Sequence, residues 1–70
     1  MMPLTMLSIG ETGSIKRITG KDDTRRFLAS LGFVEGESIT VVSRLAGNLI
    51  LSIKESRIAL DQSMAGRIMV

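Results

Sequence analysis

The chain has 70 residues, a formal net charge of +2, 44% hydrophobic residues, and neither cysteine nor histidine. Disulfides, zinc sites built from Cys or His, and nucleophiles activated by histidine are therefore excluded. Nine Lys and Arg are interspersed with seven Asp and Glu, and Tyr and Trp are absent, so the sequence does not favour a nucleic-acid-binding surface.

The apolar start of the chain is too short for a signal peptide or a membrane span, and no basic segment precedes it. We expect one domain over residues 1–70, located in the cytoplasm, with a first strand at Leu4–Leu7 and a glycine-containing turn at 9–13. A second strand is expected at Ser14–Thr19. Ile15 and Ile18 fall on opposite faces of that strand, which predicts a bulge or a strongly twisted edge.

A short helix is expected after Gly20. Asp22 or Asp23 is suited to the N-cap, and Gly32 to the position that ends the helix. Helical spacing places four residues on one face, namely Thr24, Phe27, Leu28 and Leu31. Four others fall on the opposite face, namely Arg25, Arg26, Ala29 and Ser30.

The second half of the chain is typical of strands. The β-branched run at 38–45 and the alternating run at 49–54 predict a hairpin across Gly47-Asn48. A further strand is expected at Arg57–Leu60. A helical turn capped by Asp61 and a last strand at Arg67–Val70 would follow it.

These elements predict a mainly β fold, a small SH3-like barrel of five to six strands. One short helix is inserted between strands 2 and 3, and a helical turn precedes the last strand. Closing a sheet on itself removes exposed edges, which matters for a chain this apolar. The core is expected to be aliphatic.

The ordered glycines and aliphatic residues of this chain resemble the FeoA family over nearly the whole length. The matching positions are Leu7-x-x-Gly10-x-x-Gly13-x-Ile15, Arg26-x-Leu28-x-x-Leu31-Gly32-Phe33-x-x-Gly36-x-x-Ile39-x-Val41, Gly47-x-Leu49-Ile50-Leu51-x-Ile53, Ile58-Ala59-Leu60 and Met64-Ala65-x-x-Ile68-x-Val70. Two turns depart from the family pattern. Glu35 precedes Gly36 where members usually carry proline, and Asn48 follows Gly47 where they commonly carry it.

The resemblance implies an SH3-like accessory protein of bacterial Fe(II) uptake. Its partner would be a FeoB-type membrane transporter, bound through the cytosolic GTPase region, so that the chain reaches the membrane only through that partner. The same small barrel resembles the C-terminal domain of iron-dependent repressors, which gives the alternative of a metal-sensing or transition-metal-binding module.

Five residues are candidates for partner binding. Arg25 and Arg26 would meet an acidic patch on a partner, or else lie on a solvated helix face. Phe33 is either a core residue or a surface anchor. Val42 and Ile50 would lie on the outer face of the sheet, either as scattered aliphatic residues without a function or as part of a continuous apolar patch. Such a patch would mark an interface with a partner or weak homo-oligomer formation.

No catalytic, cofactor-binding or tight metal site is predicted. Fe(II) favours His, carboxylate or thiolate ligands, and only carboxylates are present. Glu35 and Glu37 flank Gly36 on a turn, where a solvated acidic loop is the simpler interpretation. The glycines do not form a phosphate-binding loop, so any GTP chemistry belongs to the partner. A nucleic-acid-binding barrel, a detached metal sensor and an enzyme are the competing functions, and the residues favour none of them.

Overall fold

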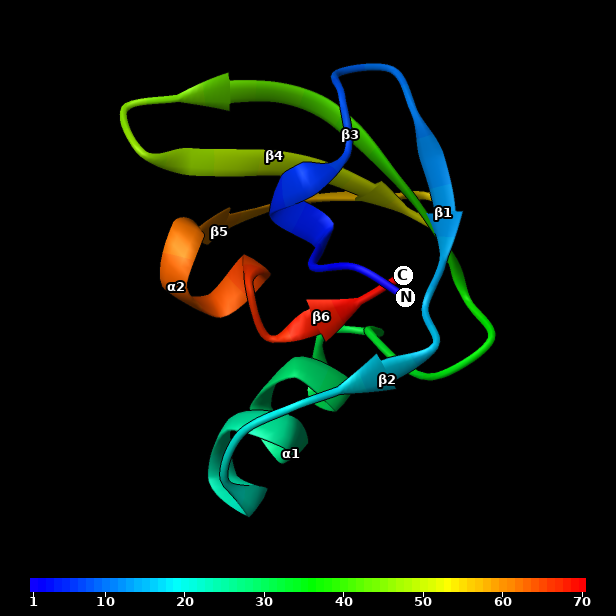
Figure 1. Cartoon of the computed structure of the whole chain (residues 1–70), viewed down its shortest axis with the longest axis vertical. Helices are drawn as coiled ribbons and strands as arrows, with labels where there is room; N and C mark the ends of the chain where they lie inside the picture. Colours follow the sequence, from blue (N-terminus) through cyan, green and yellow to red (C-terminus); the bar gives the residue numbers. More distant parts are fainter.

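Six short strands, two α-helices and one 3₁₀ turn make up the computed structural model, which describes all 70 residues (Figure 1). In chain order the elements are η1 (Leu4–Met6), β1 (Thr12–Ser14), β2 (Arg17–Ile18), α1 (Asp22–Ser30), β3 (Ser38–Leu45), β4 (Asn48–Ile53), β5 (Ser56–Asp61), α2 (Gln62–Ala65) and β6 (Ile68–Met69). The predicted order of elements is therefore confirmed, including the helix between strands 2 and 3 and the helical turn before the last strand.

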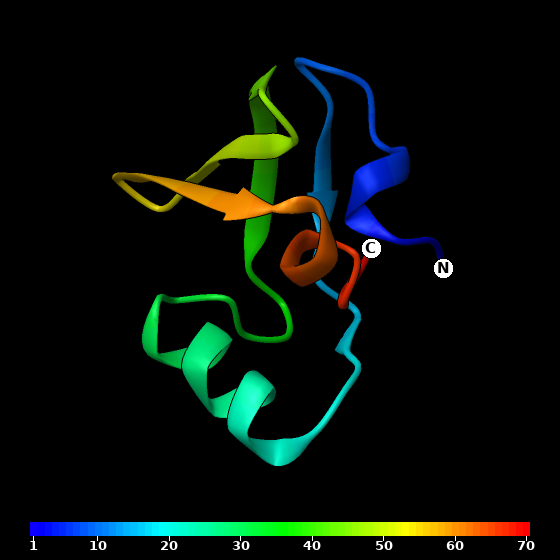
Figure 2. The ribbon, with the colours of Figure 1, turned by 90° about the vertical axis from the view of Figure 1, so that its left-hand side faces the viewer.

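Two antiparallel sheets enclose the core. The larger has the strand order β1-β3-β4-β5, and β2 and β6 form a separate two-stranded sheet. Pro3 forms an isolated bridge with Met69, so the start of the chain lies along the edge of β6 that β2 does not occupy. Figure 2 shows β2 leading from this sheet into α1, which lies at the opposite end of the molecule from the β3–β4 turn.

Thirteen residues are buried, and all of them are apolar. They are Leu4, Leu7, Ile15, Leu28, Phe33, Ile39, Val41, Leu49, Leu51, Ile53, Leu60, Ala65 and Ile68. This confirms an aliphatic core with a single aromatic side chain. Phe27, which helical spacing places on the same face as Leu28, is 51% exposed. A helix of nine residues that rests on the rim of a small barrel buries only a narrow stripe, and Leu28 occupies it.

The first predicted strand, Leu4–Leu7, is wrong, because this segment forms the 3₁₀ turn η1. Leu4 and Leu7 are three residues apart, so a single helical turn places both side chains in the core. In a segment this short, a helical turn and a strand cannot be told apart from the spacing of apolar residues.

The second predicted strand, 14–19, is divided between the two sheets. Residues 12–14 pair with β3, and residues 17–18 pair with β6. Between them Ile15 is fully buried, and its N–H and C=O bond to Glu37 and Gly36. A change of sheet, rather than a bulge, explains why Ile15 and Ile18 depart from strict alternation.

The β3–β4 hairpin turns at Ala46-Gly47, one residue earlier than predicted. Both residues have positive φ, 51° and 82°, as a two-residue type I′ turn requires. The register shifts between Val41 and Ser43, where β3 carries one residue more than β4. This bulge reverses the alternation of the strand after Val41.

Candidate partner-binding surfaces

The arginines of α1 lie on an exposed helix that contributes one side chain to the core. The helix begins at Asp22, and its N-cap residue, Lys21, makes no side-chain capping bond, so the prediction that Asp22 or Asp23 is the N-cap is wrong. Both aspartates instead stand in the first turn, where their charge suits the positive end of the helix dipole. Gly32, with a φ of +102°, ends the helix as predicted.

Arg25 and Arg26 each face an aspartate one turn earlier. The Arg26 guanidinium donates to Asp23 at 2.7 Å, and the Arg25 guanidinium lies 3.5 Å from Asp22. Both arginine side chains remain more than half exposed. Exposed pairs of this kind contribute less than about 1 kcal/mol, so a more acidic partner can replace the aspartates at little cost.

Val42 and Ile50 share the outer face of the larger sheet. Ile50 lies opposite Ser43 on β3 and Ala59 on β5, while its neighbours Leu49 and Leu51 are buried. Val42 is the extra residue at the bulge, and it is half-buried, as is Ile50. The alternation along β4 therefore places Ile50 on the face away from the core, as predicted.

Phe33 is fully buried, which excludes it from the set of surface contacts. Its N–H donates to the carbonyl oxygen of Leu28, so the chain folds back beneath α1 directly after Gly32. Of the two interpretations open from the sequence, the structure shows the core one. The prediction that the Phe33 side chain contacts a partner is wrong for the folded chain.

The remaining four candidates form two surfaces rather than one. Arg25 and Arg26 lie on α1, at one end of the molecule. Val42 and Ile50 lie on β3 and β4, whose connecting turn is at the opposite end (Figure 2). A partner that contacts both surfaces must extend along the side of the domain. The sheet surface carries two half-buried aliphatic side chains, Val42 and Ile50, which suit the dehydrated centre of an interface.

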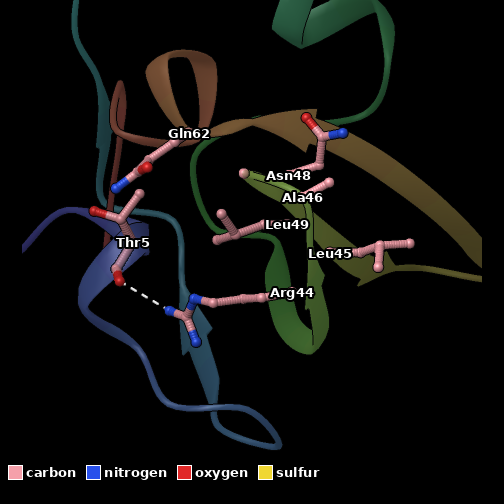
Figure 3. A pocket seen from close by; sticks show the side chains of 8 residues that line it. Thr5, Arg44, Leu45, Ala46, Asn48, Leu49 and Gln62 are labelled. Carbon is pink, nitrogen blue, oxygen red and sulfur yellow. Dashed lines mark hydrogen bonds between the residues drawn. The ribbon is translucent and has the colours of Figure 1, made fainter.

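A pocket of about 190 Å³ lies between η1, the β3–β4 turn and α2. It is lined by Thr5, Arg44, Leu45, Ala46, Gly47, Asn48, Leu49 and Gln62. Figure 3 shows Arg44 reaching from β3 to Thr5. Its Nη2 donates to the carbonyl oxygens of Thr5 at 2.9 Å and Leu7 at 2.7 Å.

Sequence reasoning missed Arg44 because strict alternation from Val41 would direct Leu45 inward. The bulge at Val42 reverses this order, so Arg44 reaches toward the N-terminal segment and Leu45 is left 69% exposed. Leu45 is thus a further apolar residue at the rim of the pocket. Only the observed strand register shows that Leu45 is exposed and that Arg44 reaches the N-terminal segment.

The structure brings together no group of three or more Asp, Glu, Cys or His side chains that could hold a metal ion. Glu37 pairs with Lys54 at 3.6 Å, so one of the two carboxylates on the 35–37 turn already has a cationic partner. The residues present therefore do not fit a metal centre within this chain. No helix is both long and apolar enough to cross a membrane.

Comparisons with known proteins agree with the fold. The family model described as the FeoA domain matches residues 2–70. The crystal structure of an iron uptake regulatory protein (FeoA) superposes with a TM-score of 0.88 at 31% identity, covering 96% of this chain and 89% of that one. Stenotrophomonas maltophilia FeoA, a procaryotic SH3 domain protein solved with zinc, has a TM-score of 0.85 at 27% identity, covering 99% and 88%. The predicted SH3-like fold is confirmed by this likeness.

A manganese-dependent transcriptional repressor has a TM-score of 0.86 at 26% identity. The match covers 94% of this chain but only 38% of the repressor, so the present domain corresponds to one part of that protein. The search of curated protein sequences gave no match.

Proposed function

Because the chain belongs to the FeoA domain family, we propose that it is a non-catalytic accessory protein of ferrous iron uptake. In this proposal it acts in the cytoplasm, where it binds the GTPase region of a FeoB-type membrane transporter and modulates the transporter. The observation that carries the proposal is the family match over residues 2–70. The chain has neither His nor Cys, so it lacks the Ser–His and Cys–His pairs that commonly activate a nucleophile.

The outer sheet face around Val42 and Ile50 is our candidate for the centre of the interface. Half-buried aliphatic side chains on a strand face lose little conformational entropy when a partner covers them, and their contact with water is removed. Arg25 and Arg26 would contribute at a rim, where exposed charges act mainly on the rate of association. To regulate the transporter, this surface must bind two of its conformations with different affinity.

The alternative is a metal-binding module related to the repressors. It is supported by the likeness to the manganese-dependent repressor and by the zinc present with the Stenotrophomonas maltophilia relative. The donor set of this chain supports it poorly, since its carboxylates do not converge. The adaptor is therefore the better-supported function.

The test is an NMR titration of the labelled protein with the isolated GTPase domain of the transporter, with and without nucleotide. Anaerobic Fe(II) serves as a parallel titrant. We expect localised shifts at Val42 and Ile50, smaller ones at Arg26, and no saturable response to iron. Saturable shifts near Glu35 and Glu37 with Fe(II), together with no response to the domain, would contradict the adaptor and favour the metal-binding module.

A further inference from the structure

The two-stranded sheet has an outer face that the proposed function does not use. Arg17 lies opposite Met69, and Ile18 lies opposite Ile68. Ile68 is fully buried and Ile18 packs against the core. Because side chains alternate across a strand, Arg17 and Met69 lie on the face away from the core.

The turn after β2 extends this face toward α1. The N–H and the hydroxyl of Thr19 both donate to the carbonyl oxygen of Arg67, at 2.8 and 3.3 Å. The Arg67 side chain runs beside Gly20, where an added Cβ would stand 3.6 Å from its Cδ. Lys21 follows directly, and at the other end Lys16 donates its N–H to Met69. We call Lys16, Arg17, Lys21 and Arg67 the basic ribbon.

The four cations of the basic ribbon are exposed, and none has a carboxylate within 4.0 Å. Three of the nine Lys and Arg side chains are paired, namely Arg25, Arg26 and Lys54. Of the six that remain, four lie on the ribbon, and only Arg44 and Arg57 lie elsewhere. Unneutralised positive charge is therefore concentrated around β2 and the residue that leads into β6.

The first residues of the chain lie beside β6, on the edge that β2 does not occupy. Met2 exchanges two backbone hydrogen bonds with Val70, both 2.8 Å long, on the side of β6 away from β2. Met1 and Met2 are 76% and 38% exposed. The only pocket lies elsewhere, beside the β3–β4 turn, so the ribbon offers no hollow in which a defined acidic group would sit.

We propose that the basic ribbon docks on an anionic phospholipid surface. A spread of unpaired cations with no pocket among them suits a fluid, charged plane better than a protein site with fixed acceptors. Because four cations provide the attraction, the binding is reversible and depends on salt. The contact would orient the domain on a membrane independently of the transporter.

The test is co-sedimentation of the full chain with vesicles of phosphatidylcholine, with and without phosphatidylglycerol. Arg17→Glu is the informative variant, and Arg57→Glu is its matched control. Both arginines are exposed, unpaired strand residues, and both replacements lower the net charge equally. We expect binding only with phosphatidylglycerol, loss of binding at about 1 M salt, and weakening by about 25-fold in Arg17→Glu from the loss of one positive charge and the gain of one negative charge. Arg57→Glu should bind nearly as the parent does.

No binding of the parent to phosphatidylglycerol vesicles would overturn the proposal. Equal weakening in both variants would also overturn it, since net charge alone would then explain the binding. If the parent ignores vesicles but Arg17→Glu loses affinity for the transporter's GTPase domain, the ribbon contacts an acidic protein surface and not lipid. The vesicles hold no transporter, so neither binding to them nor its absence bears on the test of the adaptor function. Thermal unfolding of both variants checks that they fold.

Discussion

The guanidinium of Arg44 donates through Nη2 to the carbonyl oxygen of Leu7 at 2.7 Å. The same nitrogen donates to the carbonyl of Thr5 at 2.9 Å. These two carbonyls flank the C-terminal end of η1, so one side chain of β3 holds the N-terminal turn in place. The bond to Leu7 is partly buried, which makes it stronger than the exposed pairs on α1.

Replacing Arg44 with alanine should lower the free energy of unfolding by about 1–2 kcal/mol, because two charge-assisted hydrogen bonds are lost. Urea unfolding followed by circular dichroism measures this difference. Arg57→Ala is the control and should change stability by less than about 0.5 kcal/mol, since Arg57 is an exposed side chain without an ion pair. Equal values for the two variants would show that the Arg44 bonds do not stabilise the fold.

The two phenylalanines should differ sharply in their contribution. Phe33 is fully buried, so Phe33→Ala should lower stability by about 3–5 kcal/mol and threaten folding in so small a domain. Phe27 is 51% exposed, and Phe27→Ala should lower it by less than about 1 kcal/mol. Phe33→Leu is a milder replacement, because it leaves a smaller cavity, and we expect this variant to fold. Similar losses at both positions would contradict the burial seen here.

Helical periodicity located α1 but not the depth of its burial. Thr24, Phe27, Leu28 and Leu31 do share a face, yet only Leu28 is fully buried because the helix rests on the rim of the barrel. The spacing of apolar residues shows which side of the helix faces the core, but it does not show how deeply each side chain is buried. Phe27 therefore shares the face of Leu28 and yet stays exposed.

The candidate site was predictable only in part. The alternation in β4 placed Ile50 on the outer face correctly, since both of its neighbours are buried. Arg44 and Leu45 were not foreseeable, because the bulge that exchanges their faces is set by pairing with β4 and not by β3 alone. The basic ribbon likewise combines residues 16–21 with residue 67, which only the folded chain brings together.

Asp61 and Asp22 offer a direct test of helix capping. Asp61 accepts from the N–H of Met64 at 2.7 Å, as the sequence predicted, whereas no side chain caps α1. Asp61→Ala should therefore destabilise the protein by about 1 kcal/mol, and Asp61→Asn much less, because asparagine also caps well. Asp22→Ala should change stability by less than about 0.5 kcal/mol. Chemical denaturation compares the three variants, and a larger loss at Asp22 would contradict this assignment of the caps.

The β3–β4 turn can be improved. Ala46 has a φ of 51°, a conformation that costs a side chain with a Cβ about 1–2 kcal/mol, and it precedes Gly47. Asparagine tolerates this region, and Asn-Gly is the preferred pair for a type I′ turn. Ala46→Asn should raise stability by about 0.5–1 kcal/mol, measured as a higher urea midpoint. Ala59→Asn, on a strand, should instead be neutral or destabilising.

The two candidate surfaces make separable predictions for partner binding. Ile50→Thr keeps a β-branched residue on β4 but places a hydroxyl in the proposed apolar contact. It should weaken binding of the transporter's GTPase domain about 10-fold or more, through faster dissociation, if Ile50 lies near the centre of the interface. Val34→Thr is the matched control, an equally conservative change at an apolar residue that is 39% exposed near the end of α1.

Arg26→Ala should act differently. A charge at the rim of an interface changes the association rate and its dependence on salt, and leaves dissociation nearly constant. Surface plasmon resonance at two salt concentrations separates these effects. Because Arg26 and Ile50 lie on different elements with no shared partner, the losses in the double variant should add. If Ile50→Thr binds like Val34→Thr while Arg26→Ala loses most of the affinity, the helix and not the sheet face is the centre of the interface.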